Sequence, residues 1–213
     1  MKLLLVIPFV LLFFFSCKNK SADKEKTPEV VAPDTAIAAP NTAYRDSQLL
    51  KLTGEILTLI KNKEYRSLAA FIHPATGLRF SPYGYIDTTS DLVISPDKLI
   101  AEAGSKKQAR MEWGEMDGSG DPIKLTLNEY MKRFVYDVDF IAPDSLKVNH
   151  FLGGGNSMNN LSVVYDGCDF TESHFPGFNK ELGGMDWRSL RLVFKMIDGK
   201  YYLVGIVHDE WTI

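Results

Sequence analysis

The chain has 213 residues, and its 24 lysines and arginines stand against 27 aspartates and glutamates, so the formal net charge at pH 7 is −3. No basic patch stands out in the sequence, which argues against nucleic acid as a partner. Aliphatic and aromatic residues make up 45% of the chain, which is enough for the part that folds to bury a sizeable core.

The first twenty residues, MKLLLVIPFVLLFFFSCKNK, have the anatomy of a secretory signal, with a positive charge at Lys2 and an apolar run over residues 3–15. That run is too short for a membrane-spanning helix, which needs about 20 apolar residues. The cysteine at position 17, directly after Ser16, resembles a loose form of the bacterial lipoprotein box. The resemblance implies that residues 1–16 are a lipoprotein signal peptide and that Cys17 is diacylated. An ordinary cleaved signal followed by a stray cysteine is the alternative.

Residues 17–43 are expected to be a lipid-anchored, disordered tether. The segment is charged and polar up to Lys26, and it then consists mainly of Pro, Ala, Thr and Val without an aromatic residue. Such a composition cannot bury enough surface to order itself, and its prolines keep it extended. Lipidation of Cys17 would leave only Cys168, so no disulfide is expected within the chain. Residues 44–213 are predicted to be a single globular domain outside the cytoplasm, attached to the cell envelope through the lipid.

Four helices are predicted in the first part of the domain. The first two have apolar residues at helical spacing. A third follows Ser95 and Pro96, because serine is a good N-cap and proline fits the first helical position. A fourth follows Thr126, which forms a capping box with Glu129. The predicted helices are residues 45–63, 64–72, 96–103 and 127–136.

Strands dominate the rest of the chain. The strongest signal is Asp198-Gly199 between two apolar runs, which predicts a C-terminal β-hairpin. The Gly153–Gly155 run is predicted to be a loop between two strands, and residues 170–177 are predicted to be another loop. The predicted extended segments are residues 77–86, 108–116, 145–152, 161–168, 187–197 and 200–211.

Helices first and strands last predict an α+β fold, in which N-terminal helices pack on a curved antiparallel sheet. This order of elements resembles the nuclear transport factor 2-like, or SnoaL-like, cone fold. The segments HPATGLRFSPYGYI, WGEMDGSGDPI and YLVGIVHDEWTI resemble a family of uncharacterised exported bacterial lipoproteins. The cone fold carries enzymes and non-catalytic binding modules alike, so the resemblance implies no single activity.

The hairpin register separates the three polar residues of VGIVHDEWTI. With Asp198 and Gly199 as the turn, regular pairing places Arg188 opposite Asp209 and Ser189 opposite His208. Because side chains alternate along a strand, His208 and Asp209 are predicted to point to opposite faces. Apolar neighbours surround His208 on its face. It is therefore either a core residue that needs one polar partner or a residue that lines a pocket.

Five side chains are candidates for a functional site. His208 and His150 are the candidate catalytic bases, since histidine is the commonest general base. Arg79, Arg191 and Trp211 are the candidate binding residues, because a ligand pocket combines apolar walls with a few polar anchors.

Two acidic stretches invite a metal interpretation, but neither has the spacing of a known metal loop. One runs from Asp166 through Asp169 and Glu172 to His174. The other, residues 117–121, lacks most of the acids of a calcium loop and is predicted to be a turn. We therefore predict no metal site and no cofactor.

The favoured function is that of a membrane-anchored exported lipoprotein whose domain binds a small molecule, a glycan or a protein partner, in a pocket between the helices and the sheet. The alternative is a small-pocket enzyme that uses a histidine and a carboxylate for proton transfer or hydrolysis. An interaction module without a pocket, which presents an exposed aromatic patch, is a third class. A histidine on the floor of an open pocket, bonded to a carboxylate, would favour the enzyme.

Overall fold

The computed structural model describes residues 42–155 and 158–212. The predicted signal peptide and the predicted lipidation site at Cys17 lie outside the described residues. Helix α1 begins at Thr42, two residues before the predicted start of the domain. No helix within the described ranges has the length and apolar character needed to cross a membrane.

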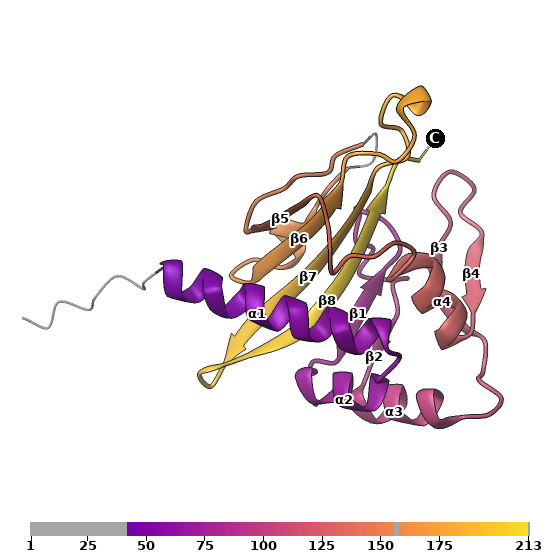
Figure 1. Cartoon of the computed structure of the whole chain (residues 1–213). Coiled ribbons are helices and arrows are strands. Elements are labelled where there is room, and N and C mark those ends of the chain that lie inside the picture. Colours follow the sequence, from indigo (N-terminus) through magenta and orange to yellow (C-terminus); the bar gives the residue numbers. More distant parts are fainter. Residues whose placement is uncertain (1–41, 156–157, 213) are drawn as a thin grey trace, which may run out of the picture. The chain divides into compact units, whose positions relative to one another are not determined.

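A six-stranded sheet forms the centre of the fold, in the order β2-β1-β8-β7-β6-β5 (Figure 1). Its strands are β1 Leu78–Ser81, β2 Val93–Ile94, β5 Ser145–Val148, β6 Asp169–Phe175, β7 Arg188–Ile197 and β8 Lys200–Glu210. The predicted α+β class is confirmed. The sheet is mixed, however, because β1 pairs with β8 in parallel while the other neighbours are antiparallel. No hairpin turn joins β1 to β8, so chain connectivity does not fix their relative direction.

The four predicted helices lie where their sequence signals placed them. The remaining elements are α1 Thr42–Lys61, α2 Tyr65–Leu68, η1 Ala69–Phe71, α3 Pro96–Gly104, α4 Leu127–Phe134, α5 Leu161–Val164, η2 Lys180–Leu182 and a two-stranded sheet of β3 Met111–Glu115 and β4 Pro122–Leu125. Ser95 caps α3 by accepting from the Lys98 amide, and Thr126 with Glu129 forms the predicted capping box of α4. Local capping chemistry is therefore sufficient to fix these helix starts.

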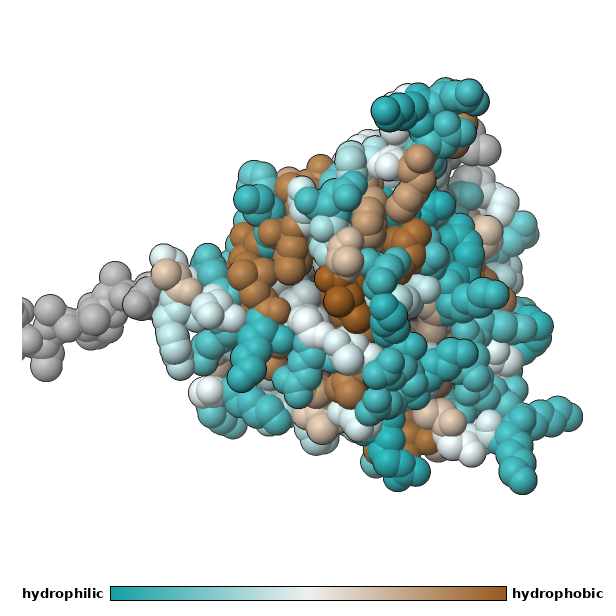
Figure 2. Space-filling view, viewed as in Figure 1, coloured by the Kyte–Doolittle hydropathy of each residue, from teal (hydrophilic) through white to brown (hydrophobic). Residues whose placement is uncertain are grey.

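The sheet is covered on both faces. Helix α1 crosses one face (Figure 1), where Thr53 and Thr171 of β6 share a buried hydrogen bond of 2.7 Å. The main core lies on this side, and in it the Trp113 ring of β3 stacks on Tyr130 of α4 at 4.0 Å. A smaller apolar cluster covers the other face: Ile86, Leu161, Phe170, Val193, Val204 and Val207. In Figure 2, hydrophobic residues reach the surface mainly beside α1, and hydrophilic residues cover most of the side around α2, α3 and α4.

The prediction of a strand over residues 161–168 is wrong. Leu161 to Val164 form the short helix α5, whose first amide is bound by the side chain of Asn159. The strand begins at Asp169 and extends through the segment predicted to be a loop. The four residues of α5, Leu-Ser-Val-Val, are too few for periodicity to separate helix from strand. Strand β6 lacks the usual apolar alternation, because Thr171, Glu172 and Ser173 are buried polar residues.

The C-terminal hairpin is confirmed, and a β-bulge interrupts it. Asp198 and Gly199 have φ angles of 49° and 77°, as a tight hairpin turn of this kind requires. Ile197 pairs with Lys200 and the predicted register holds as far as Phe194, but Val193 then pairs with Gly205. One extra residue on β8 shifts every later partner by one position.

The bulge corrects the predicted partners of the last strand. Arg188 lies opposite Glu210, and Ser189 lies opposite Asp209, so the predicted pairs Arg188–Asp209 and Ser189–His208 are wrong. His208 and Asp209 point to opposite faces, as predicted. His208 and Glu210 lie on the face of the main core, whereas Asp209 lies on the other face.

Candidate functional site

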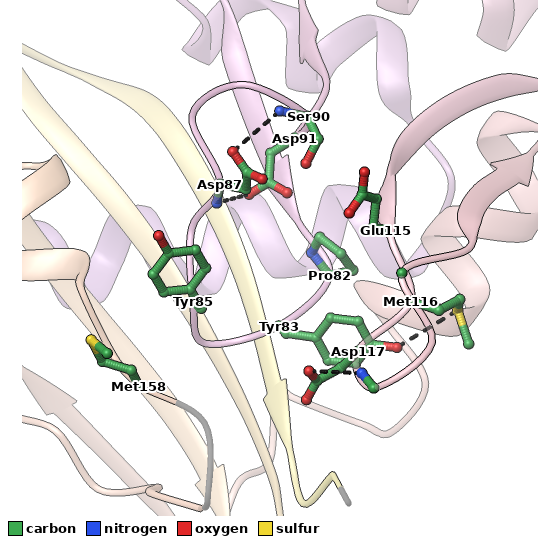
Figure 3. Close-up of a pocket in the computed structure, with 12 residues that line it drawn as sticks. Pro82, Tyr83, Tyr85, Asp87, Ser90, Asp91, Glu115, Met116, Asp117 and Met158 are labelled. Atoms are coloured by element: carbon green, nitrogen blue, oxygen red, sulfur yellow. Dashed lines mark hydrogen bonds between the residues drawn. The ribbon is translucent and has the colours of Figure 1, made fainter.

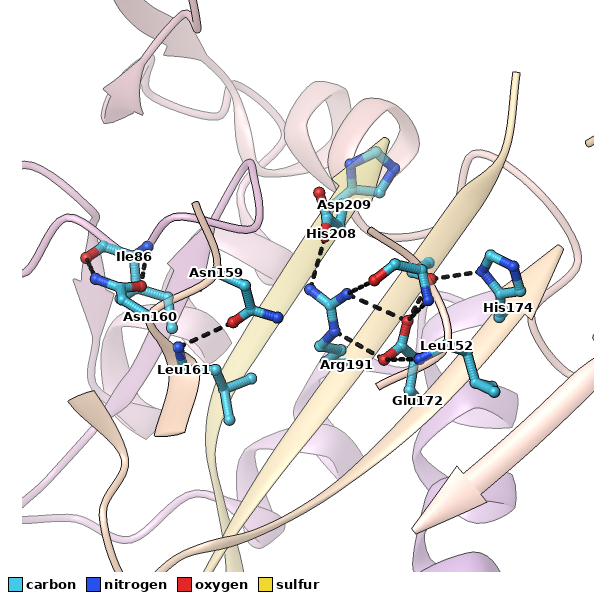
Figure 4. A network of polar contacts seen from close by, with 12 residues as sticks. Ile86, Leu152, Asn159, Asn160, Leu161, Glu172, His174, Arg191, His208 and Asp209 are labelled. Carbon is cyan, nitrogen blue, oxygen red and sulfur yellow. Dashed lines mark hydrogen bonds and ion pairs between the residues drawn. The ribbon is translucent and has the colours of Figure 1, made fainter. Parts of the chain in front are cut away.

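The guanidinium of Arg191 on β7 is 0% exposed, as is its partner Glu172 on β6 (Figure 4). Its Nε donates to Glu172 at 2.9 Å, and one terminal nitrogen donates to Asp209 at 2.8 Å. The other terminal nitrogen donates to the Gly153 carbonyl at 3.0 Å. Burial acts to lower the pKa of Arg191, but the two carboxylates raise it overall. Arg191 is thus a buried structural cation, and each of its three nitrogens is already hydrogen-bonded.

A serine and a histidine extend this network without forming a catalytic triad. The Ser189 hydroxyl donates its proton to Glu172 at 2.5 Å, so it accepts from Nδ1 of His174 at 2.8 Å. A nucleophilic serine instead donates to a histidine that acts as its base. Ser189 is also 0% exposed, so no substrate reaches it. This part of the network is therefore structural.

The glycine run after β5 passes over this network. The amides of Leu152 and Gly153 donate to Glu172 at 3.1 and 2.8 Å. A Cβ on Gly153 would collide with Oγ of Ser189 and would lie 2.6 Å from the Trp187 ring. A glycine is therefore required at position 153 by close packing.

His208 is fully buried and does not line the cavity described below. Its Nδ1 lies 3.3 Å from the Pro82 carbonyl oxygen, and its Nε2 lies 3.4 Å from Oδ1 of Asp137. Burial acts to raise the pKa of Asp137, but contacts with His208 and Arg188 lower it overall. The interpretation of His208 as a core residue accounts for this burial.

The other candidate residues are spread over the molecule. The strand predicted over residues 145–152 ends at Val148, and His150, which lies beyond its end, is exposed. Arg79 of β1 donates to the backbone carbonyls of Thr88 and Asp91. Trp211 follows β8 and is 37% exposed. The structure therefore does not bring the five candidates into one site.

A cavity rich in carboxylates lies between the segment after β1 and the turn that joins β3 to β4, and its volume is about 440 Å³ (Figure 3). It does not lie between the helices and the sheet, where the pocket was predicted. A larger cavity of about 530 Å³ does lie there, between α1 and the β7–β8 hairpin, but it has fewer carboxylates in its wall. The described lining of the carboxylate-rich cavity includes the carboxylates Asp87, Asp91, Glu115 and Asp117, the aromatic residues Tyr83 and Tyr85, and the thioethers Met116 and Met158. None of the described lining residues is basic. In Figure 3, Asp91 and Glu115 approach the cavity from opposite sides, with Tyr83 below them.

Two carboxyl groups of this cavity have widely separated pKa values. Burial raises the pKa of Asp91 to about 7, against the opposing effects of the Ser81 hydroxyl, the Asp87 amide and Arg79. The hydroxyl and amide of Thr89 lower the pKa of Asp87 to about 2. One carboxyl group is thus half protonated near neutral pH while its neighbour stays ionised.

The backbone around Asp91 holds its side chain in place. The Asp87 amide donates to Oδ2 of Asp91 at 3.1 Å, and the Asp91 amide donates back to the Asp87 carbonyl at 2.9 Å. A Cβ on Gly114, whose φ is 127°, would lie 2.9 Å from the other carboxyl oxygen. Only a glycine lets β3 approach Asp91 this closely.

Sequence reasoning missed Asp87 and Asp91, and no local motif marks them. The available signal was the density of turn-forming residues in 81–91, since Asp side chains often bind backbone amides two residues further on. No protein-family model matches the chain, and no curated protein matches it.

We expect Gly153→Ala to destabilise the domain by about 1–3 kcal/mol, because the added methyl group overpacks against Ser189 and Trp187. Gly154→Ala is the matched control, since nothing lies within 4 Å of a Cβ built there. Urea unfolding of the two variants measures the difference. Equal stability of both variants would contradict this packing.

We expect Asp91→Asn to remove part of the pH dependence of stability. The folded state holds a proton on Asp91 up to about pH 7, whereas the unfolded chain releases it near 3.8. Wild-type stability therefore falls as pH rises through this window, by about 2–3 kcal/mol between pH 5 and pH 8. The Asn variant should lack this fall.

Asp87→Asn serves as the contrast in the same urea unfolding series. Because the pKa of Asp87 is lowered in the folded state, its ionised carboxylate stabilises the fold fully above about pH 4. This contribution to the free energy of unfolding is lost only as the pH falls towards 2. The stability that Asp87→Asn loses relative to wild type should thus be the same at pH 5 and pH 8. A parallel pH profile for wild type and Asp91→Asn would show that Asp91 does not hold its proton in the folded state.

Proposed function

We propose that the protein is an exported lipoprotein, anchored by Cys17, whose domain binds a small organic cation in the cavity beside Asp91. One observation carries the ligand class: four carboxylates and no basic side chain occur among the described residues of the cavity wall. A cation supplies the opposite charge that such a wall lacks. The volume of about 440 Å³ falls within the usual range for small-molecule sites.

The uncharged part of the wall supports the same ligand class. Aromatic ring faces attract cations, and Tyr83 and Tyr85 contribute two rings to the cavity. Met116 lies 3.7 Å from the Tyr83 hydroxyl through its sulfur, and Met158 adds a second thioether. Thioether side chains adapt their shape to a ligand. A neutral glycan would use the rings but would not require four carboxylates.

An enzyme remains the second candidate, and the acid–base pair of Asp91 and Asp87 is the observation that favours it. A buried carboxyl with a pKa of about 7 next to an ionised carboxylate is a suitable general acid or base. The histidines do not support this candidate, since none lines the cavity in the described residues. In an enzyme, Asp91→Asn would abolish turnover of a bound ligand without abolishing its binding.

We expect putrescine, a short aliphatic dication, to bind the purified full chain and to raise its melting temperature. The neutral isostere 1,4-butanediol should have no effect, because it has the same carbon chain without charge. Glu115→Gln should weaken putrescine binding about 1.5- to 5-fold, the expected effect of losing one solvent-accessible ion pair. Isothermal titration calorimetry at low ionic strength measures both ligands.

Glu112→Gln is the matched control for this series. Glu112 lies on the same strand as Glu115, but it faces Lys124 at 3.8 Å and does not line the cavity. Its substitution should leave the Kd for putrescine unchanged. Equal affinity for putrescine and 1,4-butanediol would rule out a cation site.

The anchor has its own test. We expect the wild-type chain, expressed in a bacterium, to incorporate labelled fatty acid and to fractionate with membranes. Cys17→Ser should abolish the label, whereas Cys168→Ser should retain it. Label that persists in Cys17→Ser would contradict the lipidation proposal and would leave the ligand proposal untouched.

A further inference from the structure

A second group of side chains lies on the opposite side of β8 from Arg191, and it contains a histidine and two carboxylates. Asp137, His208 and Glu210 each place one donor atom so that all three atoms lie within 4.8 Å of one another. His208 and Glu210 are two residues apart on β8, so their side chains share a face. Asp137 follows α4. All three are at least partly buried, unlike ordinary exposed acidic clusters.

The hydrogen bonding of His208 leaves one ring nitrogen without a donor or an acceptor. Its Nδ1 lies 3.3 Å from the Pro82 carbonyl oxygen, which can only accept, so Nδ1 carries a proton. Its Nε2 is aimed at Oδ1 of Asp137 and forms no hydrogen bond, and that oxygen is also buried without a hydrogen-bond partner. In the neutral ring, two lone pairs would therefore face each other in a dry environment. This arrangement needs a cation between the two atoms.

The distance between the two atoms fits a metal ion. Nε2 of His208 and Oδ1 of Asp137 are 3.4 Å apart, which is within ion-pair range but without hydrogen-bond geometry. Two ligand atoms that each lie about 2.0–2.2 Å from one tetrahedral ion are about 3.3–3.6 Å apart. A histidine that ligates a metal through one nitrogen usually donates its other N–H to a carbonyl or carboxylate, as His208 does to Pro82.

Two arginines surround the group without occupying the pair of unpartnered atoms. Arg188 donates to Oδ2 of Asp137 at 2.9 Å and also contacts Glu210 at 3.2 Å. Arg133 contacts Glu210 at 2.5 Å, but its side chain is 45% exposed. Arg133 can therefore move into solvent when Glu210 turns towards an ion. Because the arginines already neutralise the two carboxylates, the affinity of the site should be moderate.

We propose that Asp137, His208 and Glu210 bind one zinc-class divalent ion. Imidazole with two carboxylates is a donor set for Zn²⁺ and its transition-metal neighbours, whereas Ca²⁺ and Mg²⁺ prefer oxygen alone. The sequence analysis predicted no metal, because these ligands are not adjacent in the chain and match no motif. The bound ion would also fix Pro82, which lines the cavity next to Asp91. The site is independent of the proposed ligand.

The test uses the full chain, stripped with EDTA and titrated with ZnCl₂ by calorimetry. We expect one equivalent of Zn²⁺ per chain with a micromolar Kd. His208→Gln and Asp137→Asn should each weaken binding at least about tenfold, because each removes one ligand. His150→Gln is the matched control, since His150 is exposed and lies outside the group, and it should bind as the wild type does.

Co²⁺ absorption provides a readout that does not depend on a variant. Co²⁺ bound by nitrogen and oxygen in a tetrahedral site should give visible bands that Zn²⁺ displaces and that Mg²⁺ does not. Thermal unfolding in EDTA identifies any variant that fails to fold, and the Asp137→Asn change nearly preserves shape. Binding that survives His208→Gln would overturn the proposal. The absence of stoichiometric binding in the wild-type chain would also overturn it. Two protons on the His208 ring by NMR would then show that a proton bridges the pair instead.

Discussion

The buried guanidinium of Arg191 is the constraint on which the arrangement of the sheet depends. A charge that is 0% exposed must be paired and fully hydrogen-bonded, because leaving it unpaired costs about 3–5 kcal/mol. Its partners come from two neighbouring strands, Glu172 of β6 and Asp209 of β8, and from the Gly153 carbonyl. A slip of either strand by one residue would turn one of these carboxylates to the other face. The ion network therefore fixes the register of three strands together.

The β-bulge in β8 makes this network and the proposed metal group compatible. Without the extra residue near Val204, Asp209 would share a face with Leu190 and the main core, and His208 would share a face with Arg191. The bulge exchanges these faces. It places Asp209 beside Arg191 and sends His208 towards Asp137. Alternation along the strand separates the two sets of charges, and the one inserted residue decides which set faces Arg191 and which faces Asp137.

The parts of the fold that were predictable depend on local chemistry. Capping at Ser95 and Thr126, and the turn at Asp198, each involve only a few consecutive residues, and the structure confirms all three. The bulge was not predictable, since alternation of apolar residues continues on both sides of it and only the partner strand reveals the shift. The parallel pairing of β1 with β8 joins distant segments, which periodicity does not address.

The candidate site was less predictable than the fold for the same reason. Arg191 was selected for its chemical type, but its guanidinium is held in structural hydrogen bonds. His208 was selected as a candidate base, but it is buried in the core and does not line the cavity. Asp91 is an ordinary turn residue by sequence. Its raised pKa arises from burial against β3, and β3 approaches closely only because Gly114 lacks a side chain. Such a site depends on contacts between segments, and no single segment shows it.

Residues 82–86, the part of the cavity wall that follows β1, are held by hydrogen bonds on both faces of the sheet. These bonds affect how the cavity would bind a ligand. On the side of the main core, the Pro82 carbonyl is bound by His208. On the other side, the backbone of Ile86 exchanges two hydrogen bonds with the Asn160 side chain, at 2.8 and 3.0 Å. Tyr83 and Tyr85 lie between these two attachments, so their backbone is already ordered before any ligand arrives. Ordering a loop on binding weakens affinity, and this wall avoids most of that cost.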